Sequence, residues 1–287
     1  MSAPATLYDA FFSTLTAELG VRHNAFDTVS LFTLGLARWL PVAALAPFLG
    51  GRLVPAVVRI GFGFLFALVL LPSLSAAAPV PLAFSTPVWW ALVLKELAIG
   101  VTLGFAASLP FFAAEMAGQA IDAARGTTVA NLIVPQTRLQ SSILGDFYHQ
   151  LFIVLYFLGG GHRFFLEAAL DANRLLPPLV PGLELGLAAY SFIDQTAMML
   201  SIALRIIAPA LVVVILLDVV LGVANRMAPQ LDVFFMSLPL KSALSALVIG
   251  LSVYGLIDVA NEYFEGHHRW FLATTERIAI ETGTAAK

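Results

Sequence analysis

Long apolar stretches separated by shorter polar connections dominate this chain. Six such segments stand out, at residues 29–49, 54–74, 89–112, 144–160, 197–223 and 233–257. About 20 apolar residues suffice for a helix to cross a bilayer, and these segments are near that length. Strands of a membrane barrel would instead alternate apolar and polar residues over about ten positions, which these runs do not. The pattern predicts an all-α, polytopic helical membrane protein.

The composition agrees with this prediction. Hydrophobic residues make up 60% of the 287 residues and charged residues only 11%, against about 25% charged in an ordinary soluble domain. The mean hydropathy is +0.91. The chain has no cysteine, which excludes disulfides, thiolate metal sites and cysteine nucleophiles. The net charge of −3 gives no indication of nucleic-acid binding.

No linker and no internal repeat divides the chain. We predict one helical domain over residues 1–260 and a polar C-terminal tail over residues 261–287. The longest connections between the apolar segments are expected at residues 118–140 and 159–189. Lysine and arginine are balanced between the two sides of an alternating topology, so the positive-inside rule assigns no orientation. The balance indicates that some segments are bent or broken helices rather than simple crossings.

Charged residues lie inside nearly every apolar segment, where each costs about 2.5–3.5 kcal/mol at the centre of a bilayer on insertion scales. Arg38 divides the first segment, and Arg205 and Asp218 lie inside the fifth. The same set contains Arg59, Lys95, Glu96, Glu115, Asp146, His149 and Lys241. Segments that carry such charges must face one another, or water, rather than lipid.

Three interpretations of these charges compete. The first is a secondary transporter or ion-coupled carrier, with a relay through Glu96, Glu115, Asp146 or Asp218. The second is a bundle whose charges pair for assembly, and its candidates are Arg38, Arg205, Asp218, Arg226 and Lys241. The third is that charges near segment ends extend to the lipid headgroups, which is the simpler explanation for Arg52, Arg59 and Arg226.

One helix face carries a polar patch. Glu115, Gln119 and Asp122 follow one another at i, i+4 and i+7, and Arg125 lies close enough to bridge to Asp122. This face fits a metal or proton site, but it lacks a clustered histidine, and a solvated helix end explains it equally well. Elsewhere, Gly100 and Gly104 have the spacing that permits close helix approach. No motif in the sequence indicates catalysis, so we predict no enzyme, no catalytic or metal site and no cofactor.

Four collinear stretches resemble the export-apparatus family called SctT in injectisomes and FliR in flagella. The matching residues are 47–55 (PFLGGRLVP) with 58–59, 109–122 (LPFFAAEMAGQAID) with 125–126, 160–162 (GGH), and 225–235 (NRMAPQLDVFF) with 239–242 (PLKS). Together they cover residues 30 to 250. The stretches at residues 121–126 and 239–242 look more like the injectisome branch, which we therefore favour.

The resemblance implies a structural role in the type III secretion export apparatus. Members of this family join SctR- and SctS-type proteins in a helical core that forms the gated entrance of the protein-export channel in the bacterial inner membrane. SctU- and SctV-type proteins, secreted polypeptides in transit and membrane lipid are further implied partners, and nucleic acid is not one. The helices of such assemblies are bent and broken, which agrees with the interior charges.

The resemblance also implies a pore plug. The family's central segment contributes apolar side chains that close the resting pore, and by residue this role transfers to Leu109, Phe111 and Phe112. Ordinary packing in the interior explains Phe111 and Phe112 equally well. Pro110 stiffens the segment at this point. The polar face at Glu115, Gln119, Asp122 and Arg125 follows directly after the plug candidates.

Overall fold

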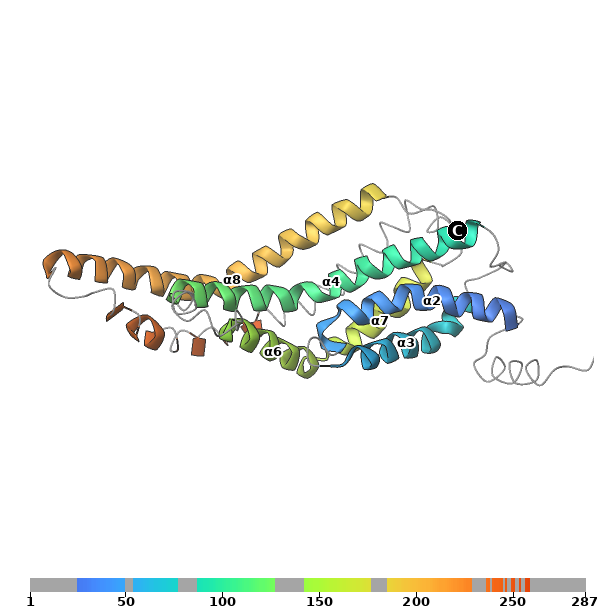
Figure 1. Ribbon diagram of the computed structural model, residues 1–287, viewed down its shortest axis with the longest axis horizontal. Coiled ribbons are helices and arrows are strands. Elements are labelled where there is room, and N and C mark those ends of the chain that lie inside the picture. The colour runs from blue at the N-terminus through green and yellow to red at the C-terminus, as the bar shows by residue number, and fades with distance from the viewer. Residues whose placement is uncertain are drawn as a thin grey trace, which may run out of the picture. The chain divides into compact units, whose positions relative to one another are not determined.

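The computed structural model describes residues 25–49, 54–76, 87–126, 142–176 and 185–228, and parts of residues 236–258. The elements in these residues are all helical (Figure 1). They are α2 (Ala25–Leu45), η1 (Pro47–Leu49), α3 (Ala56–Ala76), α4 (Pro87–Arg125), α6 (Ile143–Leu158), α7 (Gly161–Leu175) and α8 (Leu185–Met227). The predicted all-α class is therefore confirmed.

Four of the described helices are long and apolar enough to cross a membrane, in α2, α3, α4 and α8. The pair α6 and α7 makes a fifth candidate if the two helices are taken as one span. The chain breaks between them because Gly159 caps α6 and Gly160 has φ +75°, a conformation that glycine adopts without a steric penalty. These helices confirm a polytopic membrane protein in which some segments are broken.

Several predicted boundaries differ from the structure. Helix α4 continues past residue 112 to Arg125, so the connection expected at residues 118–140 is wrong in its first part. The connection expected at residues 159–189 is also wrong, because it contains α7 and the start of α8. Of the sixth predicted segment only parts are described, with residues 239–244 helical. The predicted tail at residues 261–287 lies outside the described residues.

The described residues form two compact units, and each unit is discontinuous in sequence. Unit 1 contains residues 25–108 and 162–194, and unit 2 contains residues 109–161 and 195–258. Helices α4 and α8 therefore contribute residues to both units. The predicted domain boundary at residue 260 lies outside the described residues.

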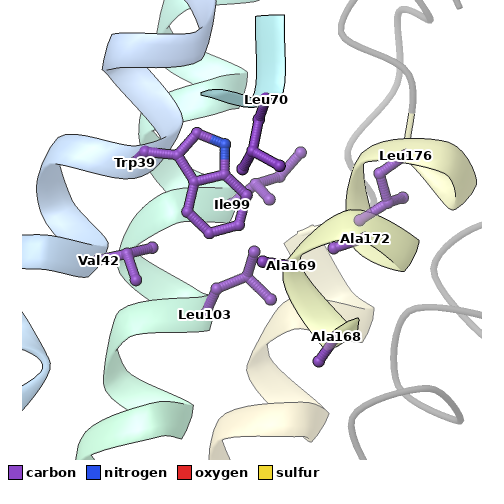
Figure 2. Packing of buried hydrophobic residues seen from close by; sticks show 9 residues of the cluster. All are labelled: Trp39, Val42, Leu70, Ile99, Leu103, Ala168, Ala169, Ala172 and Leu176. Carbon is purple, nitrogen blue, oxygen red and sulfur yellow. The ribbon is translucent and has the colours of Figure 1, made fainter. Parts of the chain in front are cut away.

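The core of unit 1 lies where α2, α3, α4 and α7 meet. On α2, Leu31, Leu34, Arg38 and Val42 are buried, at the three- and four-residue spacing of one helix face. Figure 2 shows Trp39, Leu70 and Ile99 converging from three helices, with α7 opposite. The cluster consists of Trp39, Val42, Leu70, Ile99, Leu103, Ala168, Ala169, Ala172 and Leu176. Small alanine side chains on α7 allow that helix to approach the other three.

Helices α2 and α4 touch through their backbones. A Cβ atom added at Gly100 would meet the carbonyl of Arg38 closer than real Cβ atoms come. One at Gly104 would lie 3.0 Å from the Cα atom of Val42. Two glycines four residues apart thus form a flat surface on which α2 lies, as in closely packed membrane helices. The close approach positions Arg38 against α4.

Large apolar side chains remain exposed on the outward faces of the described helices. Val57 on α3 is 78% exposed and Trp90 on α4 is 64% exposed, and Val220 on α8 is 63% exposed. Such extensive apolar exposure is unusual for a soluble monomer. It is the surface expected of helices that face lipid or other subunits.

Candidate functional site

The predicted plug and the predicted polar face lie on one part of α4, which packs on α6 within unit 2. Phe111 is fully buried there. Its ring lies edge-on to the rings of Phe152 and Tyr156, each with a centroid distance of 5.3 Å. Aromatic pairs favour this arrangement because the positive ring edge meets the negative ring face. Phe111 thus has the role of an interior side chain that holds α4 against α6.

The two other plug candidates differ from each other. Leu109 is buried, whereas Phe112 is 38% exposed. The ring of Phe112 lies 6.4 Å from that of His149 on α6, so the side chain lies beside α6 and is partly exposed. Helix α4 continues through Pro110 without a break.

The predicted polar face is directed at α6. Glu115 Oε2 lies 3.3 Å from His149 Nδ1. Gln119 Nε2 donates a hydrogen bond of 3.2 Å to Glu115 Oε1. One carboxylate therefore connects a neighbour on its own helix with a histidine on the next helix. A contact of this kind stabilises the packing of two helices when both groups are largely removed from water.

Asp122 caps the start of α6. Its Oδ2 accepts hydrogen bonds from Ser142 Oγ at 2.5 Å and from the backbone N–H of Leu144 at 3.0 Å. Asp122 also pairs with Arg125. The first N–H groups of a helix have no partner within it, and a carboxylate there is favoured by the helix dipole as well. Ser142 is the N-cap residue and accepts from the N–H of Gly145, so two side chains complete this helix end.

Gly118 brings the backbones of α4 and α6 into contact. A Cβ atom at this position would meet the carbonyl group of Leu144 at a distance that side chains do not tolerate. On the opposite helix, a Cβ atom at Gly145 would lie 2.9 Å from Gln119 Cγ. Glycine on both helices therefore permits the short distances at Asp122 and Glu115.

Arg38 forms a second polar centre, within unit 1. Its Nε donates to Glu96 Oε2 at 2.5 Å, its Nη1 to Asn173 Oδ1 at 2.9 Å and its Nη2 to the carbonyl of Leu176 at 2.8 Å. The guanidinium group is planar and presents its donors in a fixed fork. One side chain of α2 therefore connects to α4, to α7 and to the residue after α7.

Two further contacts extend this centre. Lys95 Nζ lies 3.0 Å from Glu96 Oε1, and Asn173 Nδ2 donates to Ser73 Oγ of α3 at 3.4 Å. The network thus includes all four helices of the unit 1 core. Burying the charge of Arg38 is costly. The carboxylate of Glu96 and the neutral hydrogen-bond partners compensate this cost within the chain.

The remaining candidate charges lie on or near α8 in unit 2. Asp218 Oδ1 lies 2.6 Å from Lys241 Nζ, and Asp218 is half exposed. Arg205 and Arg226 are exposed. The structure therefore brings two of the five proposed assembly charges together and pairs Arg38 with a residue outside that set. A role in assembly stays a prediction for all five.

Sequence reasoning missed several partners. Glu96 and His149 stood out as charges inside apolar segments, but they were not assigned to Arg38 and Glu115, because pairing between helices cannot be read from spacing along one helix. Asn173 gave no signal, since it lies in a segment taken as a connection. Among the residues described, no group of three or more His, Cys, Asp or Glu side chains could hold a metal ion.

The sequence matches the bacterial export proteins, family 1, over residues 29–267. It is 35% identical to the secretion system apparatus protein SsaT of Salmonella typhimurium, over 57% of this chain and 63% of that protein. It is 30% identical to the Yop proteins translocation protein T of Yersinia pestis, over 76% of this chain and 84% of that protein. It is 29% identical to the flagellar biosynthetic protein FliR of Bacillus subtilis, over 84% of this chain and 93% of that protein.

Proposed function

Because the chain belongs to the bacterial export proteins, family 1, we propose that it is a structural subunit of a type III secretion export apparatus. In this role it helps to form the gated entrance of the protein-export channel in the bacterial inner membrane. The family match over residues 29–267 carries the proposal. The candidate membrane-spanning helices, with charges paired between them, support it.

We assign the chain to the injectisome branch of the SctT/FliR family. Two relatives support this assignment, because one is named a secretion system apparatus protein and the other a Yop proteins translocation protein. The flagellar relatives belong to the same family and have a similar degree of identity. The stretches at residues 121–126 and 239–242 provide the further argument for an injectisome.

The partners that we propose are the other proteins of the export apparatus, of the SctR, SctS, SctU and SctV types. The exposed apolar faces of α3, α4 and α8 support an assembly in which helices of other subunits, or lipid, cover them. Secreted polypeptides would pass through the assembled channel. The role is structural, so we propose neither an enzymatic activity nor a cofactor.

We further propose that Phe112 contributes directly to the plug that closes the resting pore. Its partly exposed ring is available to a pore, whereas the burial of Phe111 and Leu109 suits residues that fix the segment from behind. A channel wide enough for a polypeptide leaks ions unless something seals it, and an apolar constriction seals by excluding water.

Co-purification from native membranes tests the main proposal. An affinity tag on this chain should recover SctR- and SctS-type proteins in a stable complex extracted in mild detergent. A monomer or homodimer that is free of such proteins, when extracted from cells that produce the whole apparatus, would contradict it. A secondary transporter would instead purify as a monomer or homodimer. Vesicles that contain this chain alone would then take up a small solute.

A further inference from the structure

The plug candidates and the polar face of α4 meet at one side chain of α6. The ring of His149 lies 6.4 Å from the ring of Phe112 and 6.3 Å from that of Phe111. Its Nδ1 atom lies 3.3 Å from Glu115 Oε2. One histidine therefore lies beside both phenylalanines with its ring and reaches the polar face with a nitrogen atom.

The spacing along both helices explains how one histidine reaches these groups. Phe112 and Glu115 are three residues apart in α4, so their side chains are neighbours on the helix surface. On α6, Gly145 comes four residues before His149, and a Cβ atom added at this glycine would lie 3.2 Å from the backbone oxygen of Glu115. The two helices are thus close together one turn away from the histidine. At that separation its side chain lies across the space between Phe112 and Glu115.

The ring of Phe112 depends on His149 more than the ring of Phe111 does. Phe111 is also packed against Phe152 and Tyr156. Within the described part of the chain, the ring of Phe112 pairs with His149 alone. Aromatic rings attract one another when their centroids are about 4.5–7 Å apart. Removal of the imidazole ring should therefore displace Phe112 and leave Phe111 in place.

Glu115 and Gln119 fix the orientation of the imidazole. The side chain of Glu115 is only 11% exposed, and Gln119 Nε2 donates a hydrogen bond of 3.2 Å to its Oε1 atom. The carboxylate is thus held so that its other oxygen faces His149 Nδ1. An imidazole ring can bond through a nitrogen at its edge while its apolar carbon atoms pack against an aromatic neighbour. The polar face and Phe112 are therefore connected through this histidine.

We propose that His149 is a positioning residue of the gate, which holds the ring of Phe112 where it closes the pore. Glu115 acts through His149 by holding the imidazole ring. The inference rests on the proposed function, because it takes Phe112 as part of the plug. It adds a role for the polar face in fixing the plug, beyond the packing of α4 on α6.

Ion conductance of the purified complex in planar bilayers tests the inference. His149→Ala removes the ring beside Phe112, so the phenylalanine should leave its closed position more often. We expect the conductance per complex to rise about two- to tenfold, the range that corresponds to the loss of one aromatic pair. His149→Gln should leak as well, because it keeps a polar group for Glu115 but has no ring. Gln150→Ala changes the exposed neighbour on α6, and this matched control should conduct like the unmodified complex.

A double variant separates positioning from a general loss of packing. If His149 acts through Phe112, His149→Ala should not raise the conductance further in a complex that already carries Phe112→Ala. Looser packing of α4 on α6 would instead add to the effect of Phe112→Ala. The conservative variant Glu115→Gln should stay closed, because its amide can still bond to the imidazole. Glu115→Ala should leak.

The amount of assembled complex is measured by gel filtration for every variant. Two results in intact complexes would overturn the inference, namely a closed His149→Ala complex when Phe112→Ala leaks, or leaks of the two variants that add. In both cases the proposed plug and the proposed function still stand. Failure of both His149→Ala and His149→Gln to assemble would make His149 a structural residue and would also overturn the inference.

Two further outcomes concern the proposals on which the inference rests. If Phe112→Ala does not leak in an intact complex, the plug proposal fails together with the inference. If the unmodified chain purifies without any apparatus subunit, the proposed function itself fails.

Discussion

Arg38 and Glu96 are 58 residues apart in sequence, yet Arg38 Nε donates to Glu96 Oε2 at 2.5 Å with both side chains almost completely buried. Buried pairs of this kind add little net stability over apolar residues, because desolvation offsets most of the attraction. Their effect appears when one partner is removed. The other charge then stays buried without its closest partner.

The first prediction concerns this pair. Arg38→Met should lower the free energy of unfolding by about 3–5 kcal/mol, because Glu96 loses its main partner and Asn173 loses a donor. Unfolding in detergent with increasing denaturant measures the change. The double variant Arg38→Met with Glu96→Leu should recover part of it. Arg226→Met is the exposed control. An equal loss of unfolding free energy in Arg38→Met and Arg226→Met would contradict the argument.

The second prediction concerns the contact between α2 and α4. Gly100→Ala places a Cβ atom on the backbone of Arg38, so the two helices must separate. We expect a loss of roughly 1–3 kcal/mol, as for other overpacked interiors. Gly61→Ala on α3 is the matched control, because nothing lies within 4 Å of a Cβ atom there. That variant should be neutral or slightly stabilising, since alanine favours helix. Similar effects of both substitutions would argue against the contact.

The third prediction concerns the cap on α6. Asp122→Ala removes the acceptor for Ser142 Oγ and for the N–H of Leu144. Loss of a cap costs about 0.5–2 kcal/mol, and the first turn of α6 should open more often. Hydrogen exchange of the Leu144 amide should therefore become faster. Asp146→Ala, on the exposed side of the same turn, should leave that amide unaffected. Unchanged exchange in Asp122→Ala would exclude the capping role.

The fourth prediction separates the two phenylalanines of the proposed plug. Phe112→Ala should let small ions through the resting complex while the amount of complex stays normal. Phe111→Ala should instead lower stability by about 3–5 kcal/mol, as expected for a buried aromatic side chain. Membrane conductance measures the first effect, and complex yield measures the second. If Phe112→Ala leaves conductance unchanged in an intact complex, the seal is formed elsewhere.

These two residues also illustrate what the sequence can predict. The apolar segments and the helical class followed from composition and periodicity, because lipid requires backbone hydrogen bonds to be satisfied within each segment. Phe111 and Phe112 are neighbours with the same side chain, and only the packing of α6 makes one interior and the other exposed. Sequence alone therefore left packing and pore closure as equal alternatives for both.

The sequence analysis missed helix α7 for a different physical reason. Helix α7 has a buried face of alanines and a charged opposite face, so its average hydropathy is low and a search for apolar runs passes over it. For the same reason, Asn173 of α7 was not predicted as a partner of Arg38. The pairing of Glu115 with His149 was missed because it depends on the register of two helices. That register requires a close approach of the two helices at Gly118 and Gly145, which is possible because glycine has no side chain.

The bond from Ser142 to Asp122 fixes two points of the chain that are 20 residues apart. The ends of this stretch are therefore held together by a contact between α4 and α6. Once such ends are held, the entropy of closing the chain grows only logarithmically, and doubling its length costs about 0.6 kcal/mol. The entropy of loop closure alone therefore predicts only a small cost for an insertion between these helices. An epitope or a fluorescent label inserted there would test how much extra length the assembled apparatus accommodates.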